Sequence, residues 1–348
     1  MLDIVVGGQG GDEGKAKVLA YLALFGKYSG GIRVGGSNAG HSIYYGGKKL
    51  GLKVIPAAVV NPGMTLYIAS GSYNRIDYLF DEINEIRKIE NNDSIEKRLK
   101  IDYNAVIITP EQTKEEAGNV HLANAIGSVK TGTGIALRDR IMRDKSKMCF
   151  AKDCPELKHY LCDVASEVNK GIAQGKEYLL EGTQGFKLSL LHGEFPFVTS
   201  RDTTASTFAG EAGIGPVNVN EVYIVFKPYV TRVAPGPLEN EITDEKELAR
   251  FHLQGGEVGT VSKRKRRIGQ FEWENAKRAI MLNGATKIAI THIDMFTGNE
   301  GMSKVEDMTM QAREFIDKVE TELCCEPPLP DLELISYGPN TEEMIKRR

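Results

Sequence analysis

The sequence lacks the marks of secreted and membrane proteins. Its five cysteines are an odd number without the paired spacing of a metal site, so we expect reduced thiols rather than a disulfide framework. No stretch approaches the roughly 20 apolar residues of a membrane span. Residues 1–6 also lack the basic start of a signal peptide. We therefore expect a cytoplasmic protein without a membrane partner.

The chain also has no strong charge of one sign. Its net charge is −3 and its pI is about 6.2, so it carries no global field that would attract nucleic acid. We expect no nucleic-acid partner, and any phosphate binding must come from local clusters. With 348 residues, 41% hydrophobic content and 37 glycines, the chain is long enough for one large α/β domain or two modest ones.

Short apolar runs alternate with helical patterns along the chain. Residues 2–6 form a β-branched run that stops at Gly7 and Gly8, and helical spacing follows over residues 15–25. Further strands are predicted at residues 105–108, 178–180, 222–226 and 287–291, and further helices at 78–89, 157–172, 272–281 and 307–323. This alternation predicts an α/β fold with a mostly parallel central sheet flanked by helices.

No internal repeat or proline-rich linker divides the chain, so we expect a single domain over residues 1–348. Long loops would then carry the chemistry. The candidates are the glycine-rich residues 29–47 and 127–135 and the basic residues 255–269.

The glycine loop at residues 7–15 lies where a phosphate-binding loop belongs, between a strand and a helix whose N-terminal amides can hold an anion. It is not a standard Walker A sequence, because Gln9 takes the place of the first glycine and Ala16 that of the Ser or Thr that reaches magnesium. Asp12 is the nearest oxygen donor for that role. The alternative is a glycine turn that serves packing alone.

Other polar motifs are less specific. His41, in the run from Asn38 to His41, suits proton transfer near neutral pH, although a lone histidine more often packs or caps. Residues 181–185 and 197–204 follow apolar runs, as binding loops at strand ends do, and ordinary turns are the alternative.

Residues 262–267 contain five cations in six positions. Such a run is usually a solvated patch or a nucleic-acid tail. This one lies between Gly259 and Gly269 inside an acidic chain, and the guanidinium fork matches carboxylate geometry. A dicarboxylate-binding loop therefore fits better.

Taken together, residues 11–15, 38–41, 181–185, 198–200 and the basic loop resemble, in this order, the adenylosuccinate synthetase family. The resemblance extends to residues 336–339, and the compact length is similar to the archaeal form. It implies a carbon–nitrogen ligase that couples L-aspartate to C6 of a 6-oxopurine nucleoside monophosphate. The route would be a 6-phosphoryl intermediate made with GTP or ATP and Mg²⁺, in a homodimer.

The resemblance also implies roles for matching residues. Asp12 would remove the N1 proton and, with Gly40, hold Mg²⁺; His41 would act as an acid on the phosphoryl group; Lys15 would offset phosphate charge. The implied nucleoside triphosphate site consists of Gly11, Glu13, Gly14, Lys15, Ala16, Lys17, Gly40, His41, Ser42, Asp294, Ser336, Gly338 and Pro339. The implied monophosphate site consists of Asp12, Asn38, Ser128, Val129, Arg143, Gln184, Thr199 and Arg264, and the aspartate site of Val261, Ser262, Arg264 and Arg266.

Two of these residues carry further implications. Arg143 would reach across the dimer interface to the partner's nucleotide. Asp294 favours GTP over ATP, because guanine N1 and its 2-amino group both donate to a carboxylate.

Several positions depart from the family pattern. Gly10 replaces a tryptophan, Ala16 a glycine and Gln270 an aromatic residue; residues 129–130 with Ile135, and residues 234–237, also differ. This combination looks like the viral branch, which condenses aspartate with dGMP to make a precursor of 2-aminoadenine.

We expect the lost tryptophan to open volume beside the purine and the bulk at 234–235 to disfavour a ribose 2′-hydroxyl. The retained Asp12 argues partly for IMP. The sequence thus places dGMP first and IMP as the alternative, with a GTPase or a nucleotide sensor as readings from other classes.

Overall fold

The first apolar run forms a central strand, as predicted. In the computed structural model, β1 (Leu2–Gly7) is buried along its whole length and pairs in parallel with β10 (Val219–Phe226) and β9 (Tyr178–Glu181). Leu2, Ile4 and Val6 join one hydrophobic cluster and Val5 the other, as the two-residue period of a strand requires. Both faces of the sheet are covered, which is why the run is apolar throughout.

The structure describes residues 1–233, 235–254, 257, 265–296, 298–299, 301–325 and 327–347. Four residues singled out from the sequence, Ala234, Val261, Ser262 and Arg264, lie outside this part. None of the helices within it is long and apolar enough to cross a membrane.

Eleven strands of the described residues form the central sheet. Their order is β15 (Met344–Lys346), β14 (Asp331–Ser336), β13 (Lys287–Ile290), β10, β1, β9, β2 (Gly30–Gly36), β5 (Thr65–Asn74), β6 (Leu99–Asp102) and β8 (Leu161–Cys162), with β7 (Val106–Ile107) beside β5. The pairs are parallel except for β14 with β15 at one edge. The predicted fold class is therefore confirmed.

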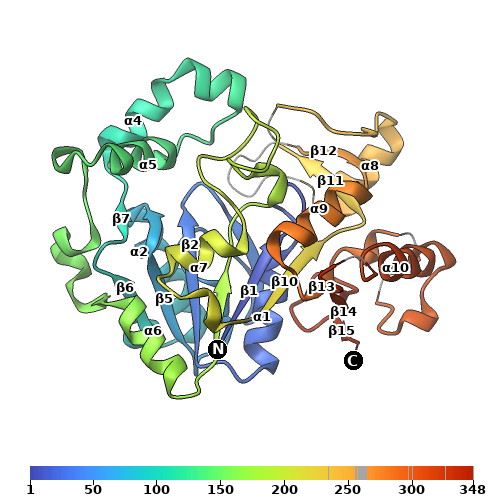
Figure 1. The fold of residues 1–348 in the computed structure, drawn as a ribbon, viewed down its shortest axis with the longest axis horizontal. Helices are drawn as coiled ribbons and strands as arrows, with labels where there is room; N and C mark the ends of the chain where they lie inside the picture. The colour runs from blue at the N-terminus through green and yellow to red at the C-terminus, as the bar shows by residue number, and fades with distance from the viewer. Residues whose placement is uncertain are drawn as a thin grey trace.

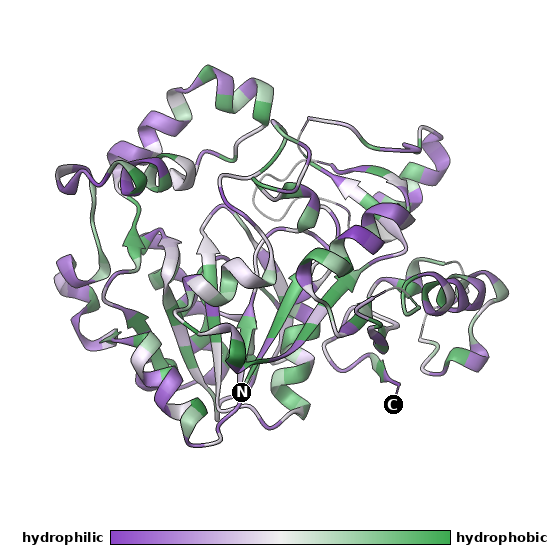
Figure 2. Cartoon of the chain, in the orientation of Figure 1, coloured by the Kyte–Doolittle hydropathy of each residue, from purple (hydrophilic) through white to green (hydrophobic). Residues whose placement is uncertain are grey.

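Helices cover both faces of the sheet (Figure 1). One cluster contains residues of α1 (Lys15–Phe25), α2 (Ile76–Glu90) and α3 (Ser94–Arg98). The other contains residues of α6 (Val164–Ala173), α7 (Ala205–Glu211), α9 (Trp273–Asn283) and α10 (Met310–Glu322). In Figure 2 the hydrophobic colour is concentrated on the strands between these layers.

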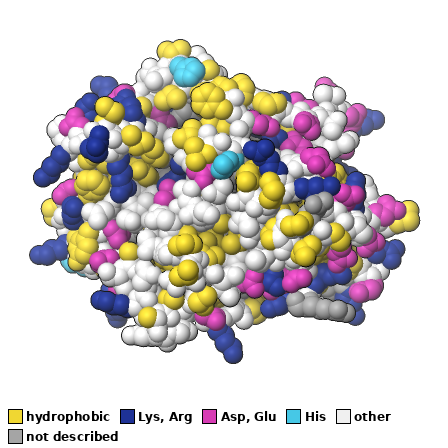
Figure 3. Space-filling model, in the orientation of Figure 1, with side chains coloured by type: hydrophobic (Ala, Val, Ile, Leu, Met, Phe, Trp, Pro, Cys, Tyr) yellow, Lys and Arg dark blue, Asp and Glu magenta, His cyan; other side chains and the backbone are white. Residues whose placement is uncertain are grey.

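Further elements lie beyond the carboxyl ends of the parallel strands. Figure 1 places α4 (Pro110–Gly118) and α5 (Thr133–Met142) together on one side there, and the ribbon of β11 (Tyr229–Arg232) and β12 (Arg267–Gln270) with α8 (Glu245–Gln254) on the other. A second ribbon joins β3 (His41–Tyr45) to β4 (Lys48–Leu52). Around the rim of the face shown in Figure 3, charged side chains of both signs are interspersed rather than gathered into one block.

The predicted strands are all present, but two other expectations are wrong. Residues 29–47 are not a loop, because β2 and β3 lie within them. Glycine permits this strand to be covered closely: a Cβ on Gly31 would lie 2.2 Å from the Ala58 Cβ. The helix predicted from residue 157 begins only at Val164, where the Asp163 side chain accepts from the Ser166 amide, 2.9 Å away.

The other two predicted loops are also partly regular structure. Thr133 begins α5 inside the loop expected at 127–135, and Arg267 begins β12 inside the loop expected at 255–269.

Candidate active site

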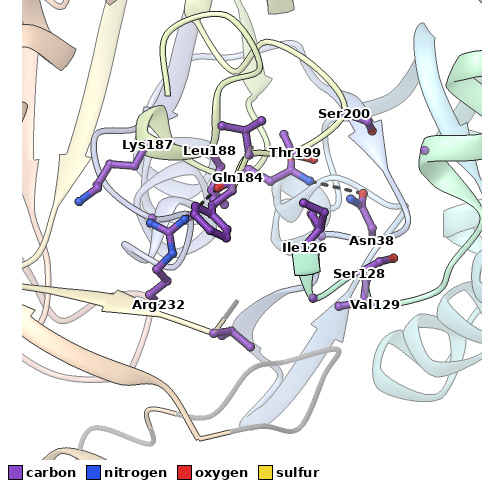
Figure 4. A pocket seen from close by; sticks show the side chains of 18 of the residues that line it. Asn38, Ile126, Ser128, Val129, Gln184, Lys187, Leu188, Thr199, Ser200 and Arg232 are labelled. Carbon is purple, nitrogen blue, oxygen red and sulfur yellow. Dashed lines mark hydrogen bonds between the residues drawn. The ribbon is translucent and has the colours of Figure 1, made fainter. Parts of the chain in front are cut away.

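A cavity of about 450 Å³ lies where loops after β1, β2 and β9 meet β11, a volume within the usual range for small-molecule sites. Residues assigned to the monophosphate from the sequence line it together: Asp12, Asn38, Ser128, Val129, Gln184 and Thr199. In Figure 4, Asn38 and Gln184 point toward one another, and the Gln184 amide donates to Asn38 Oδ1 at 3.4 Å. Apolar side chains, including Leu122, Ile126 and Phe197, complete the wall.

The glycine loop is braced from inside by Glu13. Its side chain is fully buried, and Oε1 accepts from the amides of Gln9 at 2.9 Å and Gly11 at 2.8 Å. Lys15 Nζ lies 2.8 Å from Glu13 Oε2 and 3.0 Å from Gly11 O. Gly11 and Gly14 have φ of +110° and +81°, the left-handed region that suits glycine. Glu13 therefore shapes the loop, and the Gln9 and Gly11 amides and Lys15 occupy its carboxylate.

Asp12 is held on one side only. Its Oδ2 accepts from the Thr231 hydroxyl and lies 2.9 Å from Arg266 Nε and 3.4 Å from Lys227 Nζ. Its Oδ1 is buried and has no hydrogen-bond partner among the residues that the structure describes. Burial alone would raise the pKa of Asp12, but Lys227 and Arg266 hold that pKa well below its usual range. The site thus presents an ionised carboxylate with one free oxygen.

His41 belongs to a buried cluster beside the cavity. Its Nδ1 lies 2.5 Å from Glu181 Oε1, and Arg33 Nη1 lies 3.0 Å from the same oxygen. Burial and Arg33 lower the pKa of His41, while Glu181 opposes them. Burial would raise the pKa of Glu181, but His41 and Arg33 lower it to about 2. The ionised Glu181 therefore orients the ring, and Nε2 has no partner within the described residues.

A second group lies around Lys17, outside the cavity wall. Lys17 Nζ donates to Ser336 Oγ at 2.6 Å, to Glu343 O at 3.1 Å and to Gly338 O. Burial lowers the pKa of Lys17 to about 8, against the attraction of Asp294 and Glu343. The structure thereby joins four predicted triphosphate-site residues, Lys17, Asp294, Ser336 and Gly338, while Pro339 beside them is exposed.

Other predicted residues are placed less tightly. Arg143 is exposed at the end of α5 and does not line its own chain's cavity. Ser42 lies in β3, and Ala16 is buried in α1. Arg266 is the one predicted aspartate-site residue among those that the structure describes, and it contacts Asp12.

Sequence patterns do not indicate that Lys227, Thr231 and Glu257 lie around Asp12. Lys227 directly follows the predicted strand at 222–226, and Glu257 lies within the loop expected at 255–269, but no spacing pairs either residue with position 12. Glu181 was noted only as part of a binding loop, and its contact with His41 depends on β9 lying beside β2 in the sheet.

The described residues of the site offer few protein ligands for magnesium. No group of three or more His, Cys, Asp or Glu side chains suited to a metal occurs in the described part of the chain. Asp12 Oδ1 is an unpartnered carboxylate oxygen, and Gly40 lines the same cavity. Oxygen donors of this kind fit Mg²⁺, which usually takes one or two carboxylates together with substrate phosphates.

The structure describes the surroundings of two of the departures from the family pattern. Gly10 lines the cavity, but a Cβ there would lie 2.6 Å from Thr231 O, so β11 already fills the adjacent space. Pro235 and Pro237 are not part of the cavity wall that the structure describes, and their carbonyls accept from Arg232 at 3.0 and 3.1 Å.

Comparison with known proteins gives consistent matches. A family model described as adenylosuccinate synthetase matches residues 4–154 and 149–303. Adenylosuccinate synthetase of Methanosphaera stadtmanae is 40% identical over 347 residues, covering 99% of this chain and 97% of that protein. That of Thermococcus onnurineus is 40% identical over 350 residues, covering 99% and 98%.

Two solved structures share the fold. A fully ligated adenylosuccinate synthetase from Plasmodium falciparum matches with a TM-score of 0.84 at 22% identity, covering 99% of both chains. Cyanophage S-2L succinoaminodeoxyadenylate synthetase, bound to dGMP and to dATP as an energy donor, matches with a TM-score of 0.80 at 22% identity, covering 99% of this chain and 95% of that one.

Proposed function

The chain belongs to the adenylosuccinate synthetase family and is a carbon–nitrogen ligase, and from this we propose that it couples L-aspartate to C6 of a 6-oxopurine nucleoside 5′-monophosphate. A nucleoside triphosphate would be hydrolysed to the diphosphate and phosphate. One observation carries the proposal: in a nucleotide-sized cavity with Asn38, Gln184 and Thr199, Asp12 has a buried Oδ1 that no described residue hydrogen-bonds.

The residues suggest the order of events. Asp12 accepts the N1 proton of the purine, which makes the 6-oxygen a nucleophile toward the γ-phosphoryl group. Lys15, whose ammonium group is held by Glu13 and the Gly11 carbonyl, offsets the phosphate charge, and His41 acts on the transferring group. The amine of aspartate then displaces the phosphate from C6. Magnesium, when bound at Asp12 and Gly40, would supply further positive charge at the phosphates.

Arg266 would receive the aspartate carboxylate. It is shared between Asp12 and Glu257, the latter at 2.5 Å from Nη1, so its guanidinium is already aimed at carboxylate oxygens beside the cavity. Val261, Ser262 and Arg264 remain proposed partners, although they lie outside the described residues.

For the acceptor we place IMP first and dGMP second. The full-length relatives at 40% identity are named adenylosuccinate synthetases, the activity that uses IMP. The opposite order, favoured from the sequence, depended on free volume at Gly10 and bulk at residues 234–235. The close approach of Thr231 O beside Gly10, and the hydrogen bond from Arg232 to the Pro235 carbonyl, weaken that argument. The fold shared with the dGMP-bound cyanophage protein keeps dGMP as the second candidate.

For the energy donor we propose GTP, with ATP as the alternative. Lys17 ties the Ser336–Gly338 turn to α1 beside Asp294, so a base that donates to a carboxylate suits this place.

We also propose a homodimer. Arg143 is exposed and does not line its own cavity, while its neighbours Ile141 and Met142 expose 66% and 69% of their surface. A partner covering this end of α5 would bury apolar area and bring Arg143 to its nucleotide. Light scattering that shows a monomer at micromolar concentration would contradict this assembly.

Asp12→Asn tests the proposed reaction. The variant should lose formation of the aspartate adduct, because a neutral amide cannot accept the N1 proton, and should still bind the nucleoside monophosphate. Product is followed by chromatography and binding by calorimetry. Adduct formation at the wild-type rate would refute the role of Asp12.

A further inference from the structure

Lys227 is a fully buried cation next to the cavity. It follows β10, and its Nζ lies 2.8 Å from Thr231 Oγ1, 2.9 Å from Glu257 Oε1 and 3.4 Å from Asp12 Oδ2. These three acceptors match the three N–H groups of an ammonium ion. A cation so deeply buried is held in place by its partners, because losing one of them would leave an uncompensated charge.

The backbone at Lys227 is tied to the glycine loop. Gln9 Oε1 accepts from the Lys227 amide at 3.1 Å, and Gln9 Nε2 donates to the carbonyls of Lys227 at 3.0 Å and Tyr229 at 3.2 Å. Gln9 occupies the position where a Walker A loop has glycine. The side chain therefore fixes the register between the loop that carries Asp12 and the strand segment that carries its partners.

The contacts of Asp12 are asymmetric in a way that Lys227 explains. Within the described part of the chain, Thr231, Lys227 and Arg266 all approach Oδ2, and Oδ1 has no partner. Lys227 also donates to Thr231 Oγ1, so the hydroxyl hydrogen is directed onto Asp12. Arg266 is less suited to hold this arrangement during the reaction, since we assign it to the aspartate substrate.

We propose that Lys227 is a positioning residue for the ligase reaction: with Thr231 it holds Asp12 by Oδ2, so that Oδ1 faces the purine. The inference rests on the proposed function and adds a role for a residue outside the cavity wall. Glu257, itself fully buried, balances the charge of Lys227 and Arg266 and keeps the cluster of two carboxylates and two cations neutral.

The test compares three variants with the wild type, using GTP, Mg²⁺, L-aspartate and whichever of IMP or dGMP the wild type converts. Lys227→Met removes the cation. The double variant Lys227→Met/Glu257→Gln removes both charges of this ion pair, so that no unpaired carboxylate is left at position 257. Thr231→Val removes only the hydroxyl relay and keeps every charge.

We expect kcat to fall about 100-fold in the two Lys227 variants, the loss that a misplaced reacting group produces. For Thr231→Val we expect a fall of about 10-fold. The KM values for monophosphate and triphosphate should stay within about 3-fold, because the lost contact acts on the transition state and not on binding. Arg98→Met is the matched control: Arg98 is another buried cation paired with a buried carboxylate, that of Glu90, away from the cavity. It should lower the melting temperature and leave kcat unchanged.

A folded double variant with wild-type kcat, or a Thr231→Val variant with wild-type kcat, would overturn the positioning role. So would a change confined to KM. If the double variant does not fold, Thr231→Val decides alone. A wild type that converts neither acceptor would overturn the proposed function and this inference with it.

Discussion

Glu181 Oε1 lies 2.5 Å from His41 Nδ1, and Arg33 approaches that same oxygen at 3.0 Å. The other carboxylate oxygen, Oε2, accepts a hydrogen bond from the Ala57 amide at 2.8 Å. Glu181 thus fixes the plane of an imidazole that the sequence alone presents as an isolated histidine.

Glu181→Gln should lower kcat about 10- to 100-fold, part of the factor that a positioned acid or base contributes. The KM values should change little, because Glu181 is not part of the cavity wall. Steady-state kinetics measures this. The control is Glu167 on α6, whose carboxylate accepts a hydrogen bond from the Tyr67 hydroxyl. Glu167→Gln should leave kcat unchanged. Equal kcat values in the two variants would contradict the role of Glu181.

Lys17→Met should raise the KM for the triphosphate about 10-fold or more, because hydrogen bonds to a charged group are worth about 1.5–3 kcal/mol. The variant loses the hydrogen bonds from Lys17 to Ser336 and Gly338. The residues that line the cavity for the monophosphate stay the same. Initial rates at varied triphosphate give the KM. Lys346→Met, at an exposed position of β15, serves as the control. An unchanged KM for the triphosphate would show that this turn is no part of the nucleotide site.

Asp294→Asn should lower kcat/KM with GTP about 10- to 100-fold and change kcat/KM with ATP much less. The amide presents one acceptor and a donor where guanine needs two acceptors. The ratio of the two specificity constants is the quantity to measure. A ratio equal to that of the wild type would remove Asp294 from base recognition.

The raised pKa of Glu82 predicts that the free energy of unfolding depends on pH. Burial raises its pKa to about 7 from 4.5, although the amides of Ile55, Lys53 and Val54 donate to it and oppose the rise. Below pH 4.5 the group is protonated in both states. As pH rises from about 4.5 to about 7 the unfolded chain loses this proton first, so the free energy of unfolding falls.

Glu82→Gln should remove this fall. Relative to the wild type it should gain stability between pH 5 and pH 8, on the order of 3 kcal/mol for the full shift. Urea unfolding at the two pH values measures the difference. Glu85→Gln, exposed on the same helix, should show no such gain. A Glu82→Gln curve parallel to the wild type would contradict the raised pKa.

Five of the eleven strands of the described sheet were predicted, because buried parallel strands such as β1 and β10 appear in the sequence as short apolar runs. β2 was not, because its seven residues include four glycines and carry no alternation. Its strand character comes from neighbours on both sides and from the close cover by Ala58. Local pattern does not record such tertiary contacts.

The residues of the candidate site also divide into those that the sequence indicates and those that only the structure brings together. Asp12, Lys15 and Asn38 stand in short motifs, so their residue types and spacing point to phosphate and base chemistry. Lys227 and Thr231 contact Asp12 across more than 200 residues of sequence, and Glu257 reaches it only through Lys227 and Arg266. The pairing of β1 with β10 and the placement of β11 bring these residues together. The sequence therefore indicated the residues that we propose to react, and not the residues that hold them.

The most direct test of the central claim is product formation from L-aspartate, GTP and Mg²⁺, with IMP and dGMP compared as acceptors and aspartate omitted as the control. We predict an aspartate-dependent adduct at C6, with IMP converted faster than dGMP. Faster conversion of dGMP would reverse the order of acceptors and keep the ligase. Release of phosphate without aspartate and without an adduct from either acceptor would contradict the ligase reaction itself.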